Sequence, residues 1–171
     1  MTDKILVTYA TCTGFTTGVA EAIAKTLAEG GLQVDLLPMQ QVKDLAPYRA
    51  VTAGSAIQDK RWLPEAMQFM REHQTALASQ PFAAFLVCMT LAMRDGENYR
   101  PMVSEFLAPV RAIVKPVSEG LFAGGLNIKK VPGLRNRLMF RLSVLLGVWS
   151  EGDHRDWNAV RTWAESLRTV L

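Results

Sequence analysis

The chain alternates between short apolar runs of strand length and longer segments with helical periodicity. Buried strands are predicted at five places, residues 4–10, 32–37, 50–54, 82–88 and 115–126. Helical patterns lie between or after them, around residues 19–27, 63–77, 101–113 and 157–170. This order predicts parallel strands joined by right-handed crossovers, with helices on both faces of the sheet. We therefore expect an α/β fold, a three-layer α/β/α sandwich around a doubly wound five-stranded parallel sheet of order 2-1-3-4-5.

Length and cysteine content narrow the class of protein. A chain of 171 residues suits a single domain, here expected to span residues 1–171, and can bury a core without disulfides. Cys12 and Cys88 stand far apart without a C-x-x-C partner, so neither a disulfide framework nor a metal site is expected. The first residues run directly into apolar residues 5–7 with no basic leader, which favours a cytoplasmic location.

The basic character of the chain is confined to one segment. The formal net charge is +3, yet residues 128–150 hold five basic residues and no acid, so the rest of the chain carries −2. A nucleic-acid-binding protein more often spreads basic residues over a face and interleaves aromatic ones. We therefore expect no nucleic-acid partner.

Residues 127–150 read as a basic, amphipathic insertion. One predicted helical face carries Leu134, Leu138, Leu142, Leu145 and Trp149, and another carries Lys130, Arg137 and Arg141. The stretch is too short to span a bilayer, but residues 129–149 could make peripheral contact with the inner face of the cell membrane. A crossover helix covering the sheet and a homodimer interface are alternatives that the pattern leaves open.

The loop after the first strand has the composition of a phosphate site. Ligands of open α/β sheets bind beyond the carboxyl ends of the strands where strand order reverses, here between the first and third strands. Residues 11–16 supply three threonine hydroxyls, a glycine and the first amides of a helix, which together can hold an anion. The loop contains no lysine and matches neither nucleotide motif, which favours a lone phosphomonoester without a counter-cation. The alternative is a threonine-rich helix cap with nothing bound.

This loop resembles the flavodoxin phosphate loop T-x-T-G-x-T, matched by Thr11, Thr13, Gly14 and Thr16. The resemblance implies noncovalent FMN, with its phosphate in this loop and its ring between the loops after the third and fourth strands. Trp62 would stack on the flavin ring, or else cap the next helix or lie on the surface. The residues that the resemblance assigns to the cofactor are Thr11, Cys12, Thr13, Gly14, Phe15, Thr16, Ser55, Ala56, Ile57, Gln58, Trp62, Met89, Thr90, Leu91 and Ala92.

The chain also looks like the quinone-linked protoporphyrinogen dehydrogenases. The similar stretches are residues 54–57, residues 122–126, the Asp156-Trp157 pair and the basic apolar insertion; Thr13 departs, since that family has an acid there. The resemblance implies an FMN-dependent oxidoreductase that passes electrons from a porphyrinogen or another donor to a quinone. No catalytic side chain is singled out, because flavin chemistry needs mainly orientation and electrostatics from the protein. The alternatives are an electron carrier between redox proteins, though such carriers are usually acidic, and a flavin-binding regulatory module.

Overall fold

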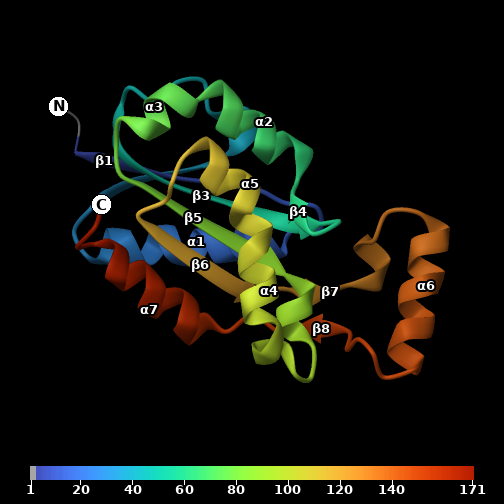
Figure 1. The fold of residues 1–171 in the computed structure, drawn as a ribbon. Helices are drawn as coiled ribbons and strands as arrows, with labels where there is room; N and C mark the ends of the chain where they lie inside the picture. The colour runs from blue at the N-terminus through green and yellow to red at the C-terminus, as the bar shows by residue number, and fades with distance from the viewer. Residues whose placement is uncertain (1–2) are drawn as a thin grey trace.

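Five parallel strands form the central sheet in a computed structural model that describes residues 3–171 (Figure 1). The strands are β1 (Lys4–Ala10), β2 (Gln33–Pro38), β3 (Tyr48–Gln58), β5 (Phe82–Cys88) and β6 (Ser118–Ala123). Their spatial order is β2-β1-β3-β5-β6, which confirms the predicted order 2-1-3-4-5. A two-residue strand, β4 (Arg61–Trp62), pairs antiparallel with the end of β3. Met1 and Thr2, which enter the expectation about a leader, lie outside the described residues.

Helices cover both faces of this sheet, as the α/β/α prediction requires (Figure 1). One face is covered by α1 (Phe15–Glu29) and α7 (Trp157–Leu167). The opposite face is covered by α2 (Pro64–Glu72), α3 (Gln74–Ala78), α4 (Arg100–Ser104) and α5 (Ala108–Ile113). Short 3₁₀ turns complete the connections, at η1 (Met39–Gln41), η2 (Met89–Ala92), η3 (Gly96–Tyr99) and η4 (Glu105–Leu107).

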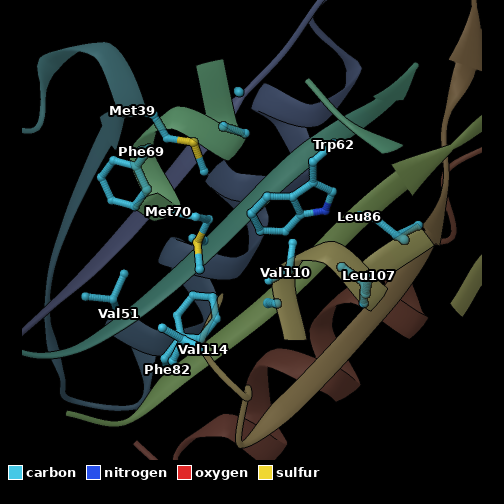
Figure 2. Packing of buried hydrophobic residues seen from close by; sticks show 14 of the residues in the cluster. Met39, Val51, Trp62, Phe69, Met70, Phe82, Leu86, Leu107, Val110 and Val114 are labelled. Atoms are coloured by element: carbon cyan, nitrogen blue, oxygen red, sulfur yellow. The ribbon is translucent and has the colours of Figure 1, made fainter. Parts of the chain in front are cut away.

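Alternating side chains of the strands pack into two separate hydrophobic cores, one on each face of the sheet. In β1, Ile5 and Val7 pack beneath α1, whereas Leu6 belongs to the core on the other side of the sheet. In that second core Trp62, only 1% exposed, lies among Met70, Leu86 and other apolar side chains (Figure 2). The two cores hold the sheet rigid, so the loops at its carboxyl edge start from fixed points.

Two predicted helices are interrupted in the structure. The helical pattern at residues 63–77 is split at His73 into α2 and α3. The pattern at residues 101–113 is split into α4, η4 and α5. Pro109 explains the second break, because proline has no N–H to continue the helical hydrogen bonds.

The insertion emerges from a small antiparallel stem. The predicted fifth strand at residues 115–126 ends as β6 at Ala123, and the chain then forms β7 (Gly125–Leu126), which pairs with β8 (Gly152–Asp153). Between them lie η5 (Ile128–Lys130) and α6 (Leu134–Leu145). Figure 1 shows α6 standing beyond the edge of the sheet, not on its face. The alternative of a crossover helix that covers the sheet is therefore wrong.

The outer face of α6 is apolar and exposed. Leu134, Leu138, Leu142 and Leu145 are 83%, 69%, 56% and 84% exposed. The sequence pattern predicts Trp149 on the same face, and this prediction is wrong. The reason is that α6 ends at Leu145 and that Gly147 has a left-handed φ of 73°. The chain turns there, and the Trp149 ring instead packs with the small cluster formed by Leu126, Ile128, Val131, Met89, Phe140 and Val144. Within residues 3–171, no helix has the length and apolar character that a bilayer crossing requires.

Candidate functional site

The loop between β1 and α1 is a tight turn built around Gly14. The Gly14 backbone has a φ of 93°, and its N–H donates to Thr11 Oγ1 at 3.0 Å. This left-handed conformation strains any residue with a Cβ, which explains the glycine. Gly14 is also the N-cap of α1 and supplies no side-chain cap, so the first amides of the helix can meet an anion.

The carboxyl edges of β1 and β3 bring the two predicted loops together. Tyr9 and Ala10 of β1 pair with Gly54 and Ser55 of β3, so β1 ends beside Ser55, while β3 continues to Gln58. Between the two loops lies a pocket of about 210 Å³. Eight of the residues assigned from sequence line it, namely Cys12, Thr13, Phe15, Thr16, Ala56, Ile57, Gln58 and Met89.

The remaining assigned residues lie around this pocket and do not line it. Thr11 supports the turn at Gly14. Ser55 is fully buried, where its hydroxyl accepts from the Leu63 N–H at 3.0 Å and donates to the Ala56 carbonyl at 2.8 Å. Ser55 therefore fixes the path from β3 to α2.

Trp62 is held in the core and cannot stack on a ligand in the pocket. The indole is 1% exposed and packs between the sheet and its covering helices (Figure 2). The physical reason is the β3–β4 hairpin, whose turn at Asp59 and Lys60 has positive φ values of 51° and 62° and folds Trp62 back against the sheet. The predicted stacking and the alternative of a surface position are therefore both wrong: Trp62 is a core residue, and Leu63 is the N-cap of α2.

The second predicted loop, η2, contributes through one residue. Met89 lines the pocket, whereas Thr90, Leu91 and Ala92 are half-buried and do not line it. Leu91 packs against Gly96, where a Cβ would collide with the Leu91 carbonyl. Ala92 lines a separate crevice between η2 and the end of α6.

The sequence did not predict that the insertion forms one wall of the pocket. Val131, Asn136 and Phe140 all line the same pocket. Asn136 donates to the Pro132 carbonyl at 3.1 Å, which fixes the first turn of α6. The mixture of apolar and basic residues identified this segment as unusual, but nothing in it indicated that its inner side closes the pocket.

Arg155, which follows β8 near the end of the chain, binds the first residue of α1. Its guanidinium donates to the Phe15 carbonyl at 3.1 Å and lies 5.1 Å from the Phe15 ring centroid and 4.4 Å from that of Trp157. Two further bonds join it to the Asp153 carboxylate at 2.8 and 2.6 Å. The arrangement ties β8 and the end of the insertion to the loop at residues 11–16.

Low pH should weaken the ion pair between Arg155 and Asp153. Hydrogen bonding from the Arg155 guanidinium lowers the pKa of the Asp153 carboxyl below its usual 3.8, although partial burial opposes the shift. Because the folded-state pKa is the lower one, the pair contributes stability above pH 3.8 and loses it as the pH falls through the lowered pKa. We expect Asp153→Asn to lower the urea midpoint at about pH 7 and to match the wild type once the pH has fallen below the lowered pKa of Asp153. A difference in midpoint that stays constant over this range would contradict the role assigned to the pair.

Comparisons with known proteins agree with this fold. The family model described as a flavodoxin domain matches residues 6–154. A Leishmania major protein named Protoporphyrinogen IX dehydrogenase (quinone) is 24% identical over 174 residues, covering 98% of this chain and 75% of that protein. The Escherichia coli K12 protein of the same name is 25% identical over 174 residues and covers 96% of this chain and 94% of its own length.

Solved flavodoxin structures superpose on the chain over nearly its whole length. A Streptococcus pneumoniae flavodoxin gives a TM-score of 0.59 at 16% identity, covering 98% of this chain and 99% of that one. The Fusobacterium nucleatum flavodoxin bound to flavin mononucleotide gives 0.54 at 11% identity, covering 97% of each chain. At these identities the structures report on the fold alone. Because the family model spans most of the chain, this protein belongs to the flavodoxin domain family.

Proposed function

We propose that the protein is an FMN-dependent oxidoreductase that takes electrons from a reduced donor of the porphyrinogen class and passes them to a quinone. The observation that carries this proposal is the pocket, because it joins a phosphate-type loop at Thr13 and Thr16 to an apolar wall at Val131 and Phe140. An ordinary phosphate site needs only the first part. The relatives named protoporphyrinogen IX dehydrogenase (quinone) support the choice of donor and acceptor.

The residues present fit FMN. The left-handed Gly14 and the uncapped amides of α1 form a cradle for a phosphomonoester, and the Thr16 hydroxyl stands at its buried side, since Thr16 is 1% exposed. Ala56, Ile57 and Met89 supply the apolar surface that a flat aromatic ring requires. When bound, FMN would supply the redox chemistry, while the chain holds the phosphate, orients the ring and excludes water from its buried side.

The exposed side of α6 indicates the surface at which the protein would reach a quinone dissolved in a membrane. Four leucines of this helix are more than half exposed, while Arg135 and Arg141 stand among them and residues 128–150 contain no acid. An apolar face edged by cations is complementary to the anionic surface of a membrane, and quinones dissolve in the hydrocarbon interior beneath that surface. We propose that α6 makes peripheral contact with such a surface, with the pocket on its inner side.

Anaerobic titration of the purified protein tests the proposal. We expect a yellow protein whose visible flavin absorbance is bleached by protoporphyrinogen and restored by a menaquinone analogue. The reason is that one pocket presents the flavin to both reactants in turn. Flavin that responds to neither reactant would contradict the donor and acceptor and leave FMN in place.

The second candidate function is electron transfer between redox proteins. The likeness to flavodoxin structures favours it as far as the fold goes. It predicts two well-separated one-electron potentials and rapid exchange with protein partners, whereas the proposed enzyme should react with the small donor and the quinone. Redox titration separates the two functions.

A further inference from the structure

The loop at residues 11–16 has no cation of its own, and the nearest arginine is already engaged. The Arg155 guanidinium donates hydrogen bonds to the Asp153 carboxylate and the Phe15 carbonyl. A phosphomonoester carries close to two negative charges at neutral pH. A positive charge placed nearby would therefore strengthen its binding more than any further neutral donor.

The insertion brings Lys130 to this loop. The Lys130 ammonium nitrogen lies 3.9 Å from the position that a Cβ would occupy on Gly14. Gly14 is the residue whose left-handed turn shapes the phosphate loop. Lys130 thus reaches the loop from η5, a segment distant in the sequence.

The backbone of η5 is fixed in this place. The Lys130 N–H donates to the Asn127 carbonyl at 3.0 Å, and the Asn127 side chain accepts from the Lys129 N–H at 3.1 Å. On either side, Ile128 and Val131 are buried, with 5% and 8% of their surfaces exposed. Within residues 3–171, the Lys130 ammonium has no carboxylate partner, so its charge is available to a ligand.

We propose that Lys130 is a phosphate-binding residue that supplies the counter-charge for the phosphomonoester held at residues 11–16. This inference rests on the proposed function, since FMN is the phosphomonoester in question. Its consequence is specificity. The insertion would favour a phosphorylated flavin over riboflavin, which has the same ring and no phosphate.

Flavin titrations of the full-length protein, stripped of bound flavin and followed by fluorescence quenching, test the proposal. We expect Lys130→Gln to weaken FMN binding about fivefold at low salt, the size expected of a partly exposed charge pair, and to leave riboflavin binding unchanged. The difference should shrink at high salt because ions screen the pair. Lys130→Arg should retain FMN affinity, because it keeps the charge.

Lys129→Gln is the matched control, because it removes the same charge one residue away. Lys129 lines a crevice with Glu151 and Asp153, so its loss should change FMN affinity by less than about twofold. Wild-type FMN affinity in Lys130→Gln, or equal losses for FMN and riboflavin, would overturn the role of Lys130. A wild-type protein that binds riboflavin and FMN equally would overturn it as well. If the wild-type protein binds neither flavin, the cofactor assignment itself fails, and this inference fails with it.

Discussion

Replacing Thr13 with alanine and Thr16 with valine is expected to weaken FMN binding by at least about a hundredfold. Each change removes one hydroxyl from the pocket side of the phosphate loop, and a hydrogen bond to a charged group contributes roughly 1.5–3 kcal/mol. Valine at position 16 preserves the volume of a side chain that is 1% exposed, so α1 should still form. Flavin fluorescence quenching measures the change.

Two controls separate loss of the phosphate contacts from loss of fold. Thr17→Val removes a hydroxyl from the next position of α1, which does not line the pocket, and should leave FMN affinity intact. Riboflavin should bind the double variant and the wild-type protein alike, because it has no phosphate. Unchanged FMN affinity in the double variant would mean that the phosphate lies elsewhere.

Replacing Leu134, Leu138 and Leu142 with serine is expected to abolish binding to vesicles that contain anionic lipid. Burying one leucine side chain contributes about 1.5–3 kcal/mol, so losing three should lower the partition constant by more than about a hundredfold. All three side chains are more than half exposed, so the fold should tolerate the change. Vesicle co-sedimentation measures the binding.

Val117→Ser is the matched control, because Val117 is 53% exposed but lies just before β6, away from α6. Vesicles without anionic lipid should bind the wild-type protein more weakly, since Arg135 and Arg141 then lose their counter-charges. Vesicle binding by the triple variant equal to that of the wild type would contradict the membrane contact. A wild-type dimer that the triple variant converts to monomer, with no vesicle binding by either protein, would assign the leucine face to a homodimer instead.

The triple variant also connects the surface to the reaction. We expect it to keep its flavin and to be reduced by the porphyrinogen as the wild-type protein is, because none of the three leucines lines the pocket. Its reoxidation by menaquinone dissolved in vesicles should slow, whereas reoxidation by a water-soluble quinone analogue should not. If the triple variant and the wild-type protein were reoxidised at equal rates by the menaquinone in vesicles, the helix would play no part in reaching the acceptor.

The strands, the main helices and the loop between β1 and α1 could be predicted because each depends on residues close together in the chain. The apolar run at β1 followed by threonines and Gly14 specifies a strand, a tight turn and a helix start within a few positions. The roles of Ser55 and Trp62 could not be predicted in the same way. Ser55 is buried within β3 between neighbouring strands, and the β3–β4 hairpin turns Trp62 into the core.

The sequence by itself therefore determined the α/β architecture, the position of the candidate site and the unusual character of the insertion. Only the tertiary structure decided which side of α6 lines the pocket and which is exposed, because a helix repeats with the same period whether its leucines face a core or solvent. It also decided that Lys130 and Arg155 reach the loop before α1. Arg155 and Phe15 are 140 residues apart in the chain, and no local pattern encodes such a contact; it follows from the β7–β8 stem, which returns the chain to the edge of the sheet.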